Sequence, residues 1–155
     1  MKVKINRIAV AVHDVKASIK TYERLLNVKF YRAGAAVVER TGLSVAASWD
    51  GGMEIISPLA GSENPNAVSL RRFLEKRGEG IYGVCYEVDN LDEADARAEA
   101  ENLPRVLKLK FTDEELDKEL GGAYSRFEES VYDGTESLGF TIAYNLLEPA
   151  ARKPA

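Results

Sequence analysis

The chain has 155 residues, a formal net charge of −4 and 45% hydrophobic residues, which suits one compact domain with a core of ordinary size. Lysines and arginines are mixed among the acids, so there is no concentrated basic stripe of the kind that binds nucleic acid. A single cysteine cannot form an internal disulfide, and no apolar run approaches the roughly 20 residues that span a bilayer. Because the N-terminus also lacks the apolar stretch of a secretory signal, we expect a cytoplasmic protein without membrane contact.

The first half of the chain reads as a strand, a helix and further β-rich runs. Apolar residues alternate with Arg7 and small residues over 7–12, as in a strand buried on one face. Asp14 can cap the following helix, and Asn27 tolerates the left-handed conformation that ends it. The β-rich runs then follow at 28–34, 36–40, 43–49 and 53–57. This order predicts a βαβββ module over residues 5–58.

The second half repeats this order. Residues 83–88 match the first strand, and Asn90 with Glu93 forms a capping box for a helix that Asn102 ends. The other expected segments are strands at 104–111, 124–132 and 138–146 and an acidic helical insert at 112–120. We therefore predict a linker over 59–79, a second module over 80–147 and a mobile tail over 148–155.

Two such modules usually pair so that their open faces enclose a cavity. The sequence thus predicts a single α+β domain over 1–155, in which two paired βαβββ modules form an eight-stranded half-barrel around a cavity. A small-molecule ligand is the expected occupant of that cavity.

Three segments of the sequence resemble a known superfamily. They are Arg-Ile-Ala-Val-Ala-Val-His-Asp-Val, Met-Glu-Ile-Ile-Ser-Pro and the stretch from Phe73 to Val88. They resemble the vicinal-oxygen-chelate proteins, which include glyoxalases, bleomycin-resistance proteins and dioxygenases, and above all the methylmalonyl-CoA epimerase group. The resemblance implies the same paired-module fold, and relatives of this kind commonly form homodimers.

The resemblance also implies a divalent metal held by one residue on each of four strands. The matching positions here are Arg7, Glu54, Gly83 and Ala143. Only Glu54 could bind a metal, whereas a catalytic site generally needs about three protein ligands. Since Ala143 replaces the glutamate that is also a base in the epimerases, we expect no metal, no cofactor and none of the ordinary epimerase, glyoxalase or dioxygenase chemistry.

Strand alternation places Arg7 and Glu54 together on the cavity side. We interpret them as the catalytic pair: Arg7 supplies the positive charge once given by the metal, and Glu54 orients it. Glu54, or a nearby acid such as Glu128 or Glu129, would then move a proton next to a carbonyl. The alternative is that Arg7 and Glu54 are an ion pair that fills a dead site.

Further residues are predicted to bind the ligand from the cavity wall. They are Trp49, Tyr82, Cys85, Glu87, Glu128, Tyr132 and Thr141. Aromatic residues at strand spacing also belong to hydrophobic cores, and Cys85 has no histidine beside it in the sequence to activate a thiolate. The acidic insert can be a solvated helix or a lid over the cavity mouth.

Three functions stay open at this point. The first is a metal-independent isomerase, epimerase or lyase acting on a small organic acid, ketone or acyl thioester. The second is a binding protein without chemistry, like the drug-sequestering members of the superfamily. The third is a degenerate subunit that serves an active partner.

Overall fold

The computed structural model describes residues 1–48 and 52–151. Its elements, in chain order, are β1 (Val3–Ala11), α1 (Val15–Leu26), β2 (Tyr31–Arg32), α2 (Ala35–Thr41), β3 (Leu43–Ser48), β4 (Met53–Pro58), α3 (Pro65–Arg77), β5 (Gly80–Val88), α4 (Leu91–Ala100), β6 (Arg105–Lys110), α5 (Asp113–Leu120), β7 (Tyr124–Tyr132) and β8 (Thr141–Pro149). Within this part of the chain, no helix is long and apolar enough to cross a membrane.

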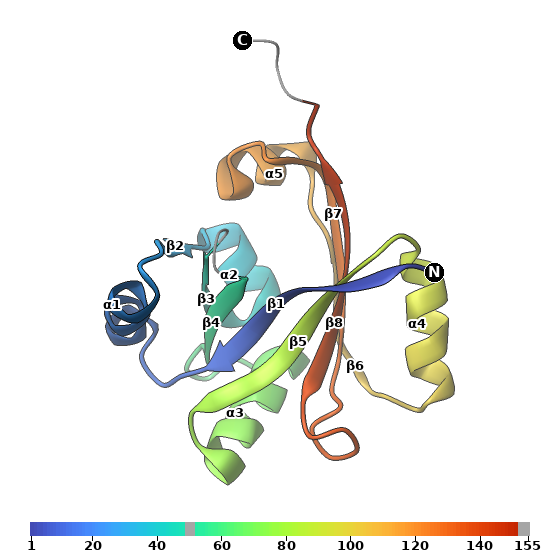
Figure 1. The fold of residues 1–155 in the computed structure, drawn as a ribbon. Helices are drawn as coiled ribbons and strands as arrows, with labels where there is room; N and C mark the ends of the chain where they lie inside the picture. Colours follow the sequence, from blue (N-terminus) through green and yellow to red (C-terminus); the bar gives the residue numbers. More distant parts are fainter. Residues whose placement is uncertain (49–51, 152–155) are drawn as a thin grey trace.

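All eight strands form one curled sheet in the order β2-β3-β4-β1-β5-β8-β7-β6 (Figure 1). The central strands, β1 and β5, pair antiparallel, and each has a parallel partner on its outer side, β4 and β8 respectively. The two halves of the sheet therefore have matching layouts on either side of the β1–β5 pair. This confirms the predicted eight-stranded half-barrel built from two modules.

Helices α1 and α4 begin and end where the sequence predicts. Asp14 accepts a hydrogen bond from the Ala17 backbone N–H, and Asn90 does the same for Glu93. Asn27 and Asn102 both have positive φ, 54° and 58°, so each supplies the left-handed residue after its helix. Both helices pack on one face of the sheet, α1 against Val10 and α4 against residues of β5 and β8.

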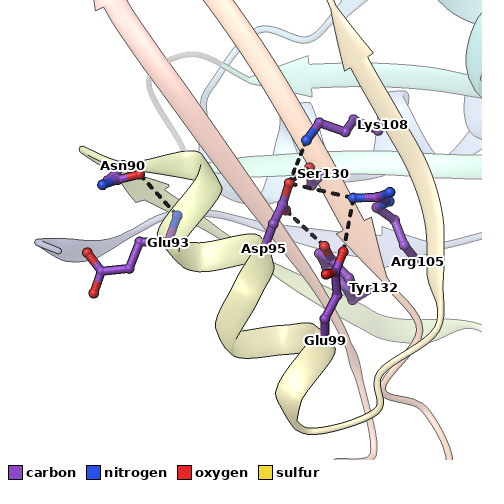
Figure 2. A network of polar contacts seen from close by, with 8 residues as sticks. All are labelled: Asn90, Glu93, Asp95, Glu99, Arg105, Lys108, Ser130 and Tyr132. Carbon is purple, nitrogen blue, oxygen red and sulfur yellow. Dashed lines mark hydrogen bonds and ion pairs between the residues drawn. The ribbon is translucent and has the colours of Figure 1, made fainter.

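Helix α4 is joined to the sheet by a polar network around the buried side chain of Asp95 (Figure 2). The Asp95 carboxylate accepts hydrogen bonds from the Lys108 ammonium at 2.7 Å, the Ser130 hydroxyl at 3.2 Å and the Tyr132 hydroxyl at 2.9 Å. The Arg105 guanidinium lies 3.7 Å from the same carboxylate. Every buried oxygen of Asp95 thus has a donor, and the network needs no ligand to satisfy it.

Three segments differ from the sequence prediction. Residues 36–40, predicted to be β-rich, lie in helix α2, which ends where Gly42 adopts φ of 70° and the Thr41 hydroxyl bonds the Val37 carbonyl. The predicted strand at 28–34 shrinks to Tyr31–Arg32. Residues 148 and 149 belong to β8 rather than to a tail, because they pair with β7.

Candidate active site

A cavity of about 180 Å³ lies on the concave face of the sheet, opposite α1 and α4. Its walls are largely apolar, with Ala9, Val131 and Ala143 among them. Helix α5 contacts α2 at the same cavity: Arg40 donates two hydrogen bonds to Glu115, at 2.6 and 2.7 Å, and Glu119 accepts one from the Gly34 backbone N–H. A role for this insert as a lid stays a prediction.

Arg7, on β1, is the most highly bonded polar side chain in the cavity. Its Nε donates to Glu54 at 2.6 Å and its Nη2 to Glu129 at 3.2 Å. Nη1 donates to the side-chain oxygens of Asn6 at 2.9 Å and Asn145 at 3.0 Å. A guanidinium has five N–H groups, so one N–H of Nη2 remains without a partner among the described residues.

The charges around Arg7 do not balance, because two carboxylates face one guanidinium. Burial opposes ionisation of Arg7, yet the negative groups around it raise its pKa well above the ordinary value and keep it cationic. Burial and the charge of Glu54 raise the pKa of Glu129, and Arg7 only partly offsets them. Glu129 therefore takes up a proton more readily than an ordinary glutamate.

Cys85 lies on β5 directly opposite Arg7. Burial raises the pKa of its thiol well above the usual range, despite the nearby arginine. The thiol is therefore neutral at physiological pH, which disfavours a nucleophilic role.

A second polar group of residues lies at the end of the cavity covered by α3. The Tyr82 hydroxyl lies 2.8 Å from the Ser69 hydroxyl, which donates to Asp133 at 2.6 Å. Thr141 Oγ1 is buried and has no hydrogen-bond partner at normal geometry among the described residues. It nevertheless lies near enough to the Tyr82 hydroxyl to lower the pKa of that tyrosine, which burial raises overall.

Comparison with known families identifies the fold. A sequence model of the Glyoxalase/Bleomycin resistance protein/Dioxygenase superfamily matches residues 6–116. The chain belongs to this superfamily. No curated protein matches this chain at a significant level.

Solved structures of similar shape span the whole chain. A hypothetical protein from Bacillus halodurans C-125 is 16% identical over 100% of both chains, with a TM-score of 0.64. A single-residue variant of methylmalonyl-CoA epimerase from Streptomyces coelicolor, in complex with 2-nitronate-propionyl-CoA, is 16% identical over 97% of this chain and 98% of its own, with a TM-score of 0.66. Methylmalonyl-CoA epimerase from Mycobacterium tuberculosis is 20% identical over 96% of this chain and 89% of its own, with a TM-score of 0.63. At these identities the likeness establishes the shared fold.

The residues at the superfamily's usual metal position do not fit a divalent cation. The Arg7 guanidinium lies between Glu54 and Glu129 and bonds an oxygen of each. Over residues 1–48 and 52–151, no group of three or more histidine, cysteine, aspartate or glutamate side chains is placed to hold a metal. A cation among these carboxylates would have to displace a guanidinium that already bonds both of them.

The structure brings together five of the predicted site residues at the cavity. Arg7, Glu54, Tyr82, Cys85 and Thr141 all line it. Their functional roles stay predictions, whereas the expectation that Arg7 and Glu54 are neighbours agrees with the 2.6 Å hydrogen bond between them. Trp49 lies outside the described residues.

Three predicted wall residues lie elsewhere. Glu87 lies beyond the cavity, where its carboxylate pairs with Lys4 at 3.1 Å. Glu128 points away from the cavity and bonds Arg126 at 2.8 Å, and Tyr132 faces α4 and bonds Asp95. Other side chains hold these three residues outside the cavity wall, and their contact with a ligand stays a prediction.

The site contains one residue, Asn145, for which no role was predicted from the sequence. Asn145 accepts from Arg7 and donates to Glu129, so it couples the two charged groups. The available signal was its position on β8, where it shares a face with the cavity residues Thr141 and Ala143. Glu129, named in the sequence analysis beside Glu128 as a possible base, is the one of the two that lines the cavity.

Proposed function

We propose that this protein is a metal-independent enzyme that moves a proton next to the carbonyl of a small organic acid, ketone or acyl thioester. The observation that carries the proposal is the Arg7 guanidinium, held between two half-buried carboxylates and with one N–H group of Nη2 that has no partner among the described residues. An isomerisation, an epimerisation or an elimination can start from this proton transfer.

Arg7 is suited to bind the carbonyl oxygen. Its unused N–H lies in a cavity whose walls are mostly apolar, where a charge-assisted hydrogen bond is stronger than in water. When the neighbouring C–H bond breaks, negative charge develops on that oxygen, and the fixed cation stabilises it. Glu54 and Asn145 act as positioning residues, because each bonds the guanidinium on a different nitrogen.

Glu129 is suited to carry the proton. One of its oxygens bonds Arg7 and Asn145, and the other has no hydrogen-bond partner among the described residues. In the proposed step, the proton leaves the carbon for this second oxygen, and the electron pair of the C–H bond moves into the enolate. Delivery of a proton to the opposite face of the carbon completes an epimerisation, and delivery to another atom of the enolate completes an isomerisation, so neither requires an oxidant.

The nature of the substrate rests on the structural likeness. Several of the similar solved structures are methylmalonyl-CoA epimerases, one of them in complex with methylmalonyl-CoA. These neighbours support an acyl thioester as the first compound to test. They do not distinguish it from other carbonyl compounds, because the identities of 13–20% support the fold alone.

The test is deuterium incorporation, in deuterated water, next to the carbonyl of methylmalonyl-CoA and of acetophenone, followed by NMR. We expect the wild-type protein to catalyse exchange in at least one compound, and Glu129→Gln to slow it about a hundredfold or more. Glu128→Gln is the matched control, since this neighbour on β7 bonds Arg126 outside the cavity. Equal exchange in the two variants, or none in the wild type, would contradict the proposal.

A second function, sequestration of a cationic small molecule without chemistry, is favoured by one observation. Two carboxylates face a single guanidinium in the cavity, so an additional positive charge would be attracted there. Thermal stabilisation by cationic drugs, without exchange in any carbonyl compound, would favour this function over the enzymatic one.

A further inference from the structure

The polar residues at the α3 end of the cavity form an ordered row of hydroxyl groups. Hydrogen bonds join Asp133 to Ser69 and Ser69 to Tyr82, and Thr141 pairs with Gly83, the residue next to Tyr82. Burial disfavours ionisation of Asp133, but hydrogen bonds from Ser69 and Thr135 lower its pKa overall, so its carboxylate is ionised and only accepts hydrogen bonds. This fixed acceptor sets the direction of every hydrogen bond in the row.

The direction follows from the number of hydrogens. Ser69 has one hydroxyl hydrogen and gives it to Asp133 at 2.6 Å. The 2.8 Å contact between Ser69 and Tyr82 must then be donated by the tyrosine. With its own hydrogen committed to Ser69, the Tyr82 oxygen can act only as an acceptor on the cavity side.

At this end of the cavity, the Thr141 hydroxyl lacks a hydrogen-bond partner among the described residues. Only 3% of the residue is exposed, it lines the cavity, and its hydroxyl oxygen has no partner at normal hydrogen-bond geometry within the described ranges. A buried hydroxyl without a partner is costly, since it has lost its hydrogen bonds to water. A ligand group that both donates and accepts would satisfy Thr141 and the Tyr82 oxygen together.

This end lies apart from the Arg7 end along the same strands. Arg7 pairs with Cys85 on β5, whereas Thr141 pairs with Gly83, next to Tyr82. Two to three residues of strand correspond to about 7–10 Å. The cavity therefore has a donor and proton-transfer end at Arg7 and Glu129 and an acceptor-rich end at Tyr82 and Thr141, with apolar wall between them.

We propose that Tyr82 and Thr141 form a subsite for a hydroxyl group, so that the substrate is a hydroxy-substituted carbonyl compound bound with its hydroxyl at the α3 end. The assignment of the carbonyl to the other end rests on the proposed function. Ser69 is a positioning residue, because it acts by fixing the hydrogen of Tyr82.

The test compares the binding of three rigid ketones at mildly acidic pH by titration calorimetry. They are para-hydroxyacetophenone, para-methoxyacetophenone and acetophenone. The methoxy compound lacks the hydroxyl hydrogen that can be donated, and acetophenone has no oxygen at the para position. We expect the hydroxy compound to bind about three- to tenfold more tightly than either analogue, the range of one or two neutral hydrogen bonds. Tight binding of the methoxy compound, or no binding of any ketone, overturns the inference.

Variants locate the effect. Thr141→Val changes shape little and should abolish the preference for the hydroxy compound, as should Tyr82→Phe. Ser69→Ala frees the Tyr82 hydrogen, so binding of the methoxy compound should improve relative to wild type. Ser130→Ala removes a buried hydroxyl on the opposite face of the sheet and should leave the preference unchanged. An unchanged preference in Thr141→Val overturns the inference.

Failure of this inference is separable from failure of the proposed function. The hydroxyl preference is a binding measurement that requires no turnover, whereas the proposed function is tested by deuterium exchange that depends on Glu129. Exchange without a hydroxyl preference would reject only the subsite, and a preference without exchange would reject only the chemistry.

Discussion

Two charged clusters lie on opposite faces of the sheet at neighbouring residues of the same strand, β7. Glu129 joins Arg7 and Glu54 on the concave face, and the next residue, Ser130, joins Asp95 on the convex face. At Asp95 the donors suffice for the carboxylate, whereas in the concave cluster one oxygen of Glu129 and one N–H of Arg7 have no partner among the described residues, and a cavity lies beside them. Charge and burial alone thus do not mark a functional site; unused bonding capacity beside a cavity does.

The pKa directions express the same difference. Burial tends to raise the pKa of both acids, but the hydrogen bonds from Lys108, Ser130 and Tyr132 lower the pKa of Asp95 overall. At Glu129 burial prevails, and its pKa is raised. The convex cluster therefore stabilises an ionised carboxylate, and the concave cluster holds a carboxylate ready to accept a proton.

Replacement of a cation in each cluster should give the largest difference in the rate of deuterium exchange. We expect Arg7→Gln to slow deuterium exchange about a hundredfold or more, since it removes the donor to the developing oxyanion. Lys108→Gln removes one of the two cations beside Asp95 and should leave exchange near the wild-type rate. Circular dichroism would check that both variants fold, and comparable rates in the two would erase the proposed distinction.

Among substitutions in the convex cluster, removal of the Asp95 carboxylate should lower stability most. We expect Asp95→Ala to lower the free energy of unfolding by about 2–3 kcal/mol, because the buried Ser130 and Tyr132 hydroxyls lose their acceptor. Glu99→Ala is the control on the same helix, and its exposed ion pair with Arg105 should contribute less than about 1 kcal/mol. Urea unfolding measures both, and equal losses would contradict the account.

The pH dependence of stability should have opposite signs in the two clusters. The raised pKa of Glu129 means that the folded state binds its proton more tightly, so its contribution to stability falls as pH rises above the ordinary value of 4.5. The lowered pKa of Asp95 gives a contribution present above the ordinary value of 3.8 and lost as pH falls below it. Urea titrations of Glu129→Gln and Asp95→Asn across this range isolate the two contributions, and the same sign in both would be inconsistent with the burial described.

The smallest expected effect on stability comes from removal of a single hydroxyl group. Tyr132→Phe removes one of the donors to Asp95 and should cost about 1 kcal/mol of stability while exchange stays unchanged. Tyr86→Phe, whose hydroxyl has no hydrogen bond within the described chain, should cost less. A loss of exchange in Tyr132→Phe would show that the convex cluster takes part in the chemistry.

Periodicity and capping signals were sufficient to predict most of the fold. The alternation in β1 and the two asparagine stops are local, so the sequence contains them directly. The prediction for residues 36–40 was wrong because so short a segment has no hydrophobic periodicity that distinguishes a strand from a helix. Only packing decides between the two. The cap glycines on either side of α2 were the signal that could have corrected the prediction.

The site was less predictable for two reasons. A register irregularity between Tyr124 and Arg126 obscures which face of β7 each residue occupies, so Glu128 and Tyr132 were assigned to the cavity in place of Glu129 and Val131. The contact of Ser69 with Asp133 joins residues far apart in the chain. Strand alternation carries no information about such pairs, and only the folded structure reveals them.

The central claim is that a guanidinium performs the electrostatic role of a divalent cation in this cavity. The most direct measurement is deuterium exchange in a carbonyl substrate before and after exhaustive chelation, with the metal content of the purified protein determined alongside. The account predicts substoichiometric metal and an exchange rate unchanged by chelation. Exchange that disappears with the chelator and returns only on addition of a divalent metal would contradict it.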